Sequence, residues 1–360
     1  MDGARRPRRS LAGQIVSVAM SDRSIAILNT GLVTSVGLSA PAACAALRAK
    51  ISNPTETRFI DSNGEWIMAH QVSLHPPSYG LNKLARMTAM AISEVLDSAL
   101  KTEWDRLPVI LCVAELDRPG RTQGLEDALF EQIQSELGVR FAASSAIVPH
   151  GRVSVAIALT RARALVHESK AARVVIAAVD SLLSWPTVSH YEQHDRLLTS
   201  AHSDGFMPGE AAGALLLGAP GERTGELLCT GIGYGREPAH VNSEEPLRAE
   251  GLSQAIEAAL ADAERKLHEI DFRITDSSGE QYYFKEATLA LSRVLRVRKQ
   301  EFDIWHPAEC TGEIGAASGV SMLSAAKAAC EKRYANGSNI LIHMSNDAGQ
   351  RAALVLRYQG

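Results

Sequence analysis

Short, continuously apolar segments alternate along the chain with segments whose apolar residues recur at helical spacing. The continuous runs predict buried strands at 24–31, 108–113, 173–179, 227–233, 339–344 and 352–357. The helical patterns lie at 42–47, 82–100, 254–270 and 285–295. Strands that are apolar along their whole length and separated by helices are typical of largely parallel or mixed sheets covered on both faces. The pattern therefore predicts an α/β fold.

Two further helical segments, 153–166 and 314–330, are apolar or small on most of their sides. A helix of that kind must be covered on both faces, whereas the single apolar face of 254–270 indicates a helix at the surface. One such segment, which needs cover on both faces, occurs in each half of the chain. We therefore expect two similar halves, 21–222 and 223–360, whose sheets enclose a central layer of helices.

The first 20 residues differ from the rest. They contain four arginines at 5, 6, 8 and 9, followed by a short apolar stretch that includes Gln14. An export signal would need a longer apolar region and a small-residue cleavage site. We interpret residues 1–20 as a disordered basic leader.

Composition and charge narrow the classes of function. The 360 residues carry a net charge of −4, which gives no long-range attraction to nucleic acid or an anionic membrane. No apolar run approaches the roughly 18 residues of a membrane span. The five cysteines form no CxxC pair, which favours reduced, buried thiols in a cytoplasmic protein.

Neither a metal nor a cofactor is expected. His306 and Cys310 lack further ligands at zinc spacing. The glycines of 231–235 lack the spacing of a dinucleotide-binding loop, so a turn at the end of a strand is the better interpretation.

Residues 202–217 form the most informative stretch. A polar turn with Asp204 and Gly205 runs through Pro208, Gly209 and Glu210 into a continuous apolar run. This order of residues predicts a tight loop that leads the chain into a buried strand.

The same stretch resembles the Asp-Gly-Phe-x-x-Gly-Glu-Gly-Ala-Gly signature of β-ketoacyl synthases (3-oxoacyl-ACP synthases), which belong to the thiolase superfamily. Ala211 stands where that family usually has glycine. Segments 30–37, 312–319 and 345–349 resemble three more family motifs, in the family's order. The resemblance runs from about residue 25 to residue 356. It implies a thiolase-like layered αβαβα sandwich made of two similar halves, and a homodimer.

Members of that family condense acyl groups with one cysteine and two histidines, and this chain departs from that set. At the turn into the helix expected at 153–166 it has His150, Gly151 and Arg152, none of which is a thiol or a hydroxyl. The resemblance places Asp276 at the first histidine and Glu313 at the second. A carboxylate cannot donate a hydrogen bond to a developing enolate unless it is protonated, and two carboxylates repel an anionic malonyl group. Standard condensation is therefore not expected.

Nearby hydroxyls do not replace the missing thiol. Ser144 and Ser145 precede the turn and Ser154 lies one turn into the helix, so we interpret them as surface or capping residues. The resemblance also places Ala308 where the family usually has a lysine.

Three interpretations of Asp276 and Glu313, together with His150 or Arg152, remain open. They form a buried salt-bridge network in a vestigial cavity, a binding site for a cationic ligand, or an acid/base pair with a raised pKa. By the resemblance, Asp204, Phe206 and Asn346 are candidates for substrate binding.

The sequence therefore favours a catalytically degenerate β-ketoacyl synthase homologue that acts as a binding, scaffold or accessory protein. The alternative is an atypical acyltransferase or 3-oxoacyl synthase that uses a rearranged site. Divergent bacterial thiolase-like proteins with an Asp-x-x-Gly-Glu loop resemble this chain and imply an accessory role in effector delivery by type VI secretion. The implied partners are a second copy, another protein, or an acyl-carrier protein or acyl thioester.

Overall fold

The computed structural model describes residues 24–96, 103–169, 171–221 and 224–360, and in them ten strands form one mixed sheet. The first part of the chain supplies β1 (Ile25–Val33), β4 (Val109–Cys112), β5 (Ala146–Val148), β6 (Arg173–Ser181) and β7 (Glu210–Gly218). The second part supplies β8 (Glu226–Arg236), β9 (Phe272–Thr275), β10 (Ile304–Trp305), β11 (Asn339–Ser345) and β12 (Gln350–Gln359). The leader expected at 1–20 lies outside the described residues, as does the expected boundary at 222–223.

The two sets of five strands repeat one topology. The sheet order is β10-β9-β11-β12-β8-β1-β7-β6-β4-β5. When the five strands of each set are numbered in chain order, both sets have the order third, second, fourth, fifth, first from the outer edge to the middle of the sheet. In both sets the second strand is parallel to the third and fourth, and the fifth is antiparallel to the fourth and first. Residues 25–27 of β1 pair with 227–229 of β8, which joins the sets into one sheet. The expectation of two similar halves is confirmed.

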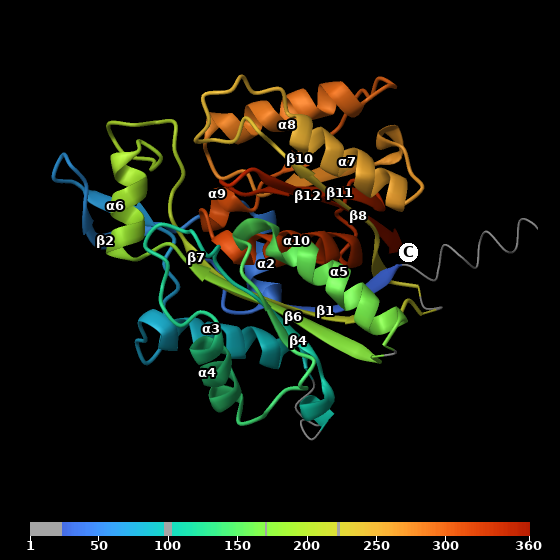
Figure 1. Ribbon diagram of the computed structural model, residues 1–360, viewed down its shortest axis with the longest axis horizontal. Helices are drawn as coiled ribbons and strands as arrows, with labels where there is room; N and C mark the ends of the chain where they lie inside the picture. Colours follow the sequence, from blue (N-terminus) through green and yellow to red (C-terminus); the bar gives the residue numbers. More distant parts are fainter. Residues whose placement is uncertain (1–23, 97–102, 170, 222–223) are drawn as a thin grey trace, which may run out of the picture.

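Helices form three layers around these strands (Figure 1). The central helices α5 (Ser154–His167) and α10 (Ser318–Glu331) share one apolar core with strands of both halves. On the far side of the first half lie α3 (Gly80–Val95) and α4 (Asp127–Leu137), and on the far side of the second half lie α7 (Glu250–Asp262) and α8 (Gln281–Val294). The predicted αβαβα sandwich is confirmed.

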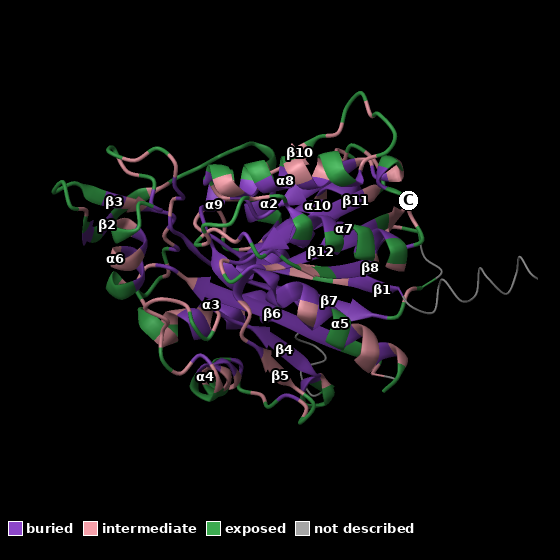
Figure 2. Ribbon diagram, turned by 45° about the horizontal axis from the view of Figure 1, so that its top comes forward, coloured by how far each residue is buried: buried purple, intermediate pink, exposed green. Residues whose placement is uncertain are grey.

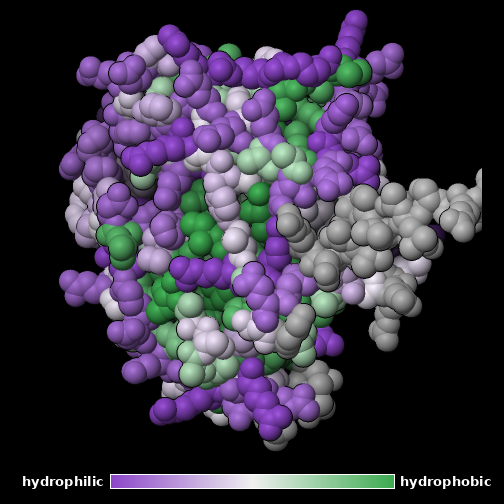
Figure 3. Space-filling model, turned by 45° about the vertical axis from the view of Figure 1, so that its right-hand side comes forward, coloured by the Kyte–Doolittle hydropathy of each residue, from purple (hydrophilic) through white to green (hydrophobic). Residues whose placement is uncertain are grey.

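Burial follows the layers. The strands and the central helix α10 are buried along most of their length, whereas α5 is buried mainly in its first turns and the outer helices expose one side (Figure 2). On the face seen in Figure 3, apolar residues gather near the middle and hydrophilic residues surround them. This distribution explains why α5 and α10 read as apolar or small on most sides, because each has sheet on two sides.

The surface helix expected at 254–270 is shorter than its apolar pattern. Helix α7 ends at Asp262, Glu264 has a left-handed φ of 52°, and a 3₁₀ turn, η3 (Leu267–Glu269), follows. Leu267 and Ile270 are nevertheless buried in the same cluster as α7. The apolar pattern therefore indicates which residues face the core. After Asp262 the backbone is no longer α-helical, but Leu267 and Ile270 still face that core.

Smaller elements lie at one end of the layers. The hairpin of β2 (Thr55–Ile60) and β3 (Trp66–Ala69) packs with α6 (Trp185–Gln193) and the loop around Phe206. Two 3₁₀ turns, η2 (Gly151–Val153) and η4 (Gly315–Ala317), lead into α5 and α10. The helices α2 (Ala40–Arg48) and α9 (Ala308–Thr311) complete the described elements. These turns bring the predicted site residues together.

Candidate functional site

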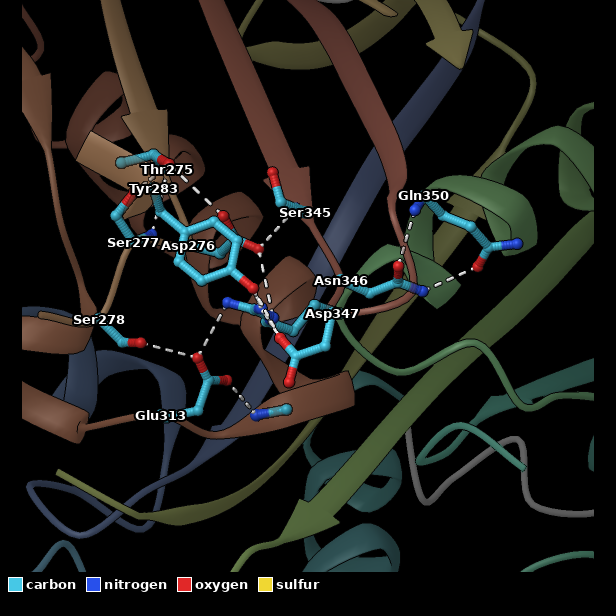
Figure 4. Close-up of polar contacts among 12 residues, drawn as sticks. Thr275, Asp276, Ser277, Ser278, Tyr283, Glu313, Ser345, Asn346, Asp347 and Gln350 are labelled. Atoms are coloured by element: carbon cyan, nitrogen blue, oxygen red, sulfur yellow. Dashed lines mark hydrogen bonds and ion pairs between the residues drawn. The ribbon is translucent and has the colours of Figure 1, made fainter. Parts of the chain in front are cut away.

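Four chain segments that are distant in sequence meet at η2, and Figure 4 shows three of them through Asp276, Glu313 and Asp347. Arg152 belongs to η2, Asp276 directly follows β9, Glu313 lies between α9 and η4, and Asp347 lies in the turn between β11 and β12. All four are connected by hydrogen bonds or ion pairs. The structure therefore brings three of the sequence-predicted site residues into one cluster and adds Asp347.

Arg152 is at the centre of the cluster and is 5% exposed. Its Nη1 lies 3.2 Å from Glu313 Oε2, its Nη2 lies 2.8 Å from Asp347 Oδ1, and its Nε lies 3.9 Å from Asp276 Oδ2. Nη2 also donates to the Tyr283 hydroxyl at 2.6 Å, and the guanidinium lies 4.5 Å from the centre of that ring. Burial alone lowers the pKa of Arg152, but the surrounding tyrosine and carboxylates raise it well above its ordinary value.

A second arginine, Arg196, closes the cluster on the side of α6 and α8. It makes a bidentate pair with Glu280, with N···O distances of 2.7 and 2.9 Å, and its Nη1 lies 2.7 Å from Asp347 Oδ2. The hydroxyls of Tyr283 and Tyr191 donate to the same Asp347 carboxylate. Burial raises the pKa of Asp347, but Arg196 and Arg152 outweigh burial and hold that pKa well below its usual range. Asp347 therefore stays ionised.

Glu313 and Asp276, the carboxylates that the resemblance places at the family's two histidines, have different environments. Glu313 accepts from Ser278 Oγ and from the Gly315 N–H, each at 2.8 Å. Asp276 accepts from the Ser345 N–H at 2.9 Å and is 4% exposed. Burial raises the pKa of Asp276 to about 6, although Arg152 opposes the shift. Asp276 can therefore change its charge near physiological pH.

A third arginine lies on the opposite side of the cluster. Arg118 donates to Glu115 at 2.8 Å and to Asp180 at 3.2 Å, and Asp180 also accepts from the Ala316 N–H at 2.9 Å. Gly151 and Gly315 lie beside these carboxylates with left-handed φ values of 54° and 53°. A Cβ on Gly151 would collide with the Glu115 carboxylate, and one on Gly315 with that of Asp180. Both turns therefore require glycine.

Little space remains among these groups. The cavity is lined by Glu115, Arg118, Arg152, Leu182, Tyr191, Arg196, Phe206, Glu280, Glu313 and Asp347. Its volume is about 10 Å³, which is about the room that one water molecule needs. Charged and aromatic side chains fill the interior at the start of α5.

The other predicted residues have different positions. His150 is half-buried with its Nδ1 3.3 Å from Gln350 Oε1, outside the lining of the cavity. Phe206 is 2% exposed, lines the cavity, and meets the Tyr191 ring edge-on at 5.0 Å. Of the three substrate-binding candidates, Phe206 is thus the one that reaches this cavity.

The other two substrate-binding candidates, Asp204 and Asn346, each accept a hydrogen bond from a backbone N–H. Asp204 Oδ1 accepts from the Gln281 N–H at 2.7 Å, which satisfies a free amide at the start of α8. Asn346 exchanges two 2.8 Å hydrogen bonds with Gln350 across the turn between β11 and β12. Both contacts fix loops that border the cluster.

The sequence pattern did not identify Arg196, Asp347, Glu280 or Tyr283 as members of the cluster. Tyr283 lies in no motif, and its ring packs on Arg152. Asp347 lies in segment 345–349, which resembles a family motif, and this resemblance was the sequence feature that could have identified it. Arg196 lies in no motif, and its contacts with Glu280 and Asp347 join residues 84 and 151 positions away.

The five cysteines are free and buried, as expected. Burial raises the pKa of Cys44 to about 12 and those of Cys229, Cys310 and Cys330 to about 11, and it also raises the pKa of Cys112. A thiol of that kind is protonated at neutral pH, whereas nucleophilic attack needs the thiolate.

Two other features bear on the class of site. Within the described ranges, His, Cys, Asp and Glu side chains form no group of three or more that could hold a metal ion. In the same ranges, no helix combines the length and the apolar character that a bilayer crossing requires.

The fold is similar to that of solved ketosynthases. A chain of a type II polyketide complex of an acyl-carrier protein with its ketosynthase superposes with a TM-score of 0.76 and 15% identity, covering 93% of this chain and 99% of that one. A chain of the ishigamide ketosynthase/chain length factor gives 0.74 and 18%, covering 94% and 100%. The module 6 ketosynthase of the Bacillus subtilis 168 bacillaene synthase gives 0.73 and 12%, covering 94% and 72%. No protein-family model matches the chain, and no curated protein matches its sequence.

Proposed function

We propose that this chain, which has the thiolase-like fold of ketosynthases, does not carry out their condensation and acts as a binding, scaffold or accessory protein. The observation that carries the proposal is the position of Arg152. Its guanidinium, at the start of the central helix α5, fills the interior with Glu313, Asp347 and Tyr283 and leaves about 10 Å³.

The chemistry of the cluster supports this proposal. Acyl transfer needs a nucleophile, and η2 supplies a backbone glycine and a buried cation where a thiolate would be required. The condensation also needs donors toward a developing oxyanion. Here the Gly315 N–H already donates to Glu313 and the Ala316 N–H to Asp180. The donors at the start of α10 are thus engaged by the protein's own carboxylates.

Binding a protein partner is the proposed alternative to catalysis. The similar structures include a ketosynthase in complex with its acyl-carrier protein and a ketosynthase in complex with its chain length factor. By analogy, the partner is a second copy of this chain, another subunit of the same fold, or an acyl-carrier protein. The accessory role in type VI secretion remains a prediction of the sequence resemblance.

An atypical acyltransferase is the second candidate, and Asp276 is the observation that favours it. A carboxyl with a pKa of about 6 that lies 3.9 Å from Arg152 Nε can exchange a proton at physiological pH. Substrate access would require the Arg196 pairs with Glu280 and Asp347 to open.

One assay separates the two candidates. The full chain is incubated with an acyl-carrier-protein thioester and its malonyl counterpart, and thioester consumption is followed. The proposal predicts no turnover above a blank, and a stable complex with a protein partner in size-exclusion chromatography. Turnover that is lost in both Asp276→Ala and Glu313→Ala, but kept in the exposed-site control Glu257→Ala, would establish the acyltransferase instead.

A further inference from the structure

A group of polar side chains lies between the second half of the sheet and helix α8, and it adjoins the site described above through Thr275, which donates to Asp276 at 3.5 Å. Arg273 and Thr275 are on β9, His343 is opposite Thr275 on β11, and His306 directly follows β10. Phe272 and Ile274, which alternate with Arg273 and Thr275, face the central core. Arg273 and Thr275 therefore face the outer layer. The ring of His306 lies 5.1 Å from that of Phe284 on α8.

The repeated fold does not require polar residues on this face. On the outer face of the first half, strands β4 and β6 present Val109, Leu111, Val175 and Ala177 to an apolar core with α3 and α4. The second half has the same strand order, yet Arg273 and His343 occupy its outer face. A specific interaction explains them better than the demands of packing do.

Arg273 is a buried cation without a buried anion. It is 8% exposed, donates from Nη2 to the Phe302 carbonyl at 3.1 Å, and places its guanidinium 4.6 Å from the Phe302 ring centre. Its Nε has no hydrogen-bond partner among the described residues. Burial lowers the pKa of Arg273, and no carboxylate in the described part of the chain offsets that shift. By contrast, Arg351 on β12, two strands away in the sheet, is paired with Glu286 at 2.7 Å.

His306 offers a second free group in the same place. Within the described chain its buried Nδ1 also lacks a hydrogen-bond partner. Burial lowers the pKa values of His306 and His343. The Glu309 carboxylate opposes the shift of His306, and the charge of Arg273 lowers both pKa values further. His306 is therefore neutral at physiological pH and can donate one N–H.

The neighbouring carboxylates are engaged elsewhere. Asp303 accepts from Asn336, Asp271 accepts from the Asn339 N–H, and Glu309 pairs with Lys50 at the surface. None of these three carboxylates forms an ion pair with Arg273. The group is also close to solvent, since Phe302 and His306 are half-buried and Phe284 is 38% exposed.

We propose that Arg273 and His306 form a binding site for a small oxyanion, a phosphate or a carboxylate group, at the β10 edge of the sheet under α8. A guanidinium recognises both groups through parallel N–H donors, and a neutral imidazole N–H supplies a further donor. A buried donor without a partner in a native fold indicates a bound ion or water, and the unbalanced charge of Arg273 favours an anion. The site does not depend on the function proposed for the Arg152 cluster.

The test is a titration of the full chain with inorganic phosphate and, separately, with acetate, at constant ionic strength in sodium chloride. Calorimetry measures the Kd and a thermal melt measures the Tm. The two anions distinguish a phosphate site from a carboxylate site. Arg273→Met removes the charge but keeps the length of the side chain, and Arg293→Met on the exposed side of α8 is the matched control.

The proposal predicts saturable binding of at least one anion by the wild type and by Arg293→Met. It also predicts at least a tenfold higher Kd in Arg273→Met and a weaker effect in His306→Asn. Without anion, Arg273→Met should melt at or above the wild-type Tm, because a buried unpaired cation is removed. No saturable binding of either anion, equal binding by Arg273→Met, or a crystal structure grown in phosphate with only a water molecule between Arg273 and His306 would overturn the proposal.

Discussion

Arg152 Nη2 lies 2.8 Å from Asp347 Oδ1, and this contact joins the start of the central helix α5 to the turn between β11 and β12. The same carboxylate is held by Arg196, which comes from the loop after α6. Asp347 therefore connects the first half of the chain to the second through two arginines. In this arrangement the interior is closed by charge pairs, and each pair depends on the others.

Asp347→Asn should be among the most destabilising single changes in the cluster. It removes the negative charge that Arg152 and Arg196 share, so each arginine loses one ion pair and keeps the pair with Glu313 or Glu280, while the shape of the side chain is nearly kept. We expect a loss of about 2–4 kcal/mol, which is below the range for a fully buried pair because Asp347 is 28% exposed. Urea denaturation measures the loss. Glu257→Gln on the exposed side of α7 should change the unfolding free energy by less than about 0.5 kcal/mol.

Arg152 and Glu313 should be strongly coupled. Arg152→Met removes the cation that Asp276 and Glu313 share and one of the two that Asp347 contacts, and it should cost about 3–5 kcal/mol. Adding Glu313→Gln removes one of the repelling charges. The double variant should therefore be more stable than the sum of the single changes by about 0.5–3 kcal/mol. Additive effects in this double-mutant cycle would mean that the 3.2 Å pair contributes no interaction energy.

The pH dependence of stability should reveal Asp276. Its pKa in the fold is about 6 compared with an ordinary value of 3.8, so the native state binds this proton more tightly than the unfolded state does. Asp276 thus favours folding below about pH 4, and this contribution is lost as pH rises through about 6. Relative to Asp276→Asn, the wild type should lose about 2 kcal/mol of unfolding free energy between pH 4 and pH 7, on the scale of 1.36 kcal/mol for each pKa unit. A difference between the two proteins that does not change with pH would contradict the assignment.

Gly151 should tolerate no side chain. Gly151→Ala places a Cβ against the Glu115 carboxylate at a left-handed φ of 54°. Gly64 is the matched control, since its φ of 84° is also left-handed but a Cβ there would meet nothing within 4 Å. We expect about 1 kcal/mol of backbone strain in both variants and a further 1–3 kcal/mol, approximately, in Gly151→Ala alone. Equal Tm shifts for the two variants would show that the Glu115 contact is not restrictive.

The layered architecture could be predicted because the apolar pattern of each segment depends on how many of its faces are covered. Continuous apolar strands and helices that are apolar on most sides each report how many faces are covered, and β6 and α10 show the expected burial. The end of α7 could not be read in this way, since Leu267 and Ile270 stay on the buried face after the helix has ended. The spacing of apolar residues shows which side chains face the core, and it does not show where the helix ends.

The cluster was predictable only in part. Asp276, Glu313 and Arg152 lie in or near motif segments, so their order along the chain was enough to bring them into one hypothesis. Arg196 meets Glu280 and Asp347 only because the tertiary fold brings the loop after α6 to residues 84 and 151 positions away. Asp204 and Asn346 lie in motif segments too, but their hydrogen bonds go to the backbone amide of Gln281 and to Gln350. A motif therefore located the region, and tertiary contacts determined each role.

The most direct test of the account is the intact mass of the protein after incubation with an acyl-carrier-protein thioester. A ketosynthase that condenses acyl groups passes through a covalent acyl-enzyme, whereas this chain has Arg152 at the start of α5 and buried thiols with raised pKa values. The account predicts an unchanged mass at neutral pH. A stoichiometric mass gain of one acyl group, located by peptide mapping to residues 144–154 or to a cysteine, would contradict it.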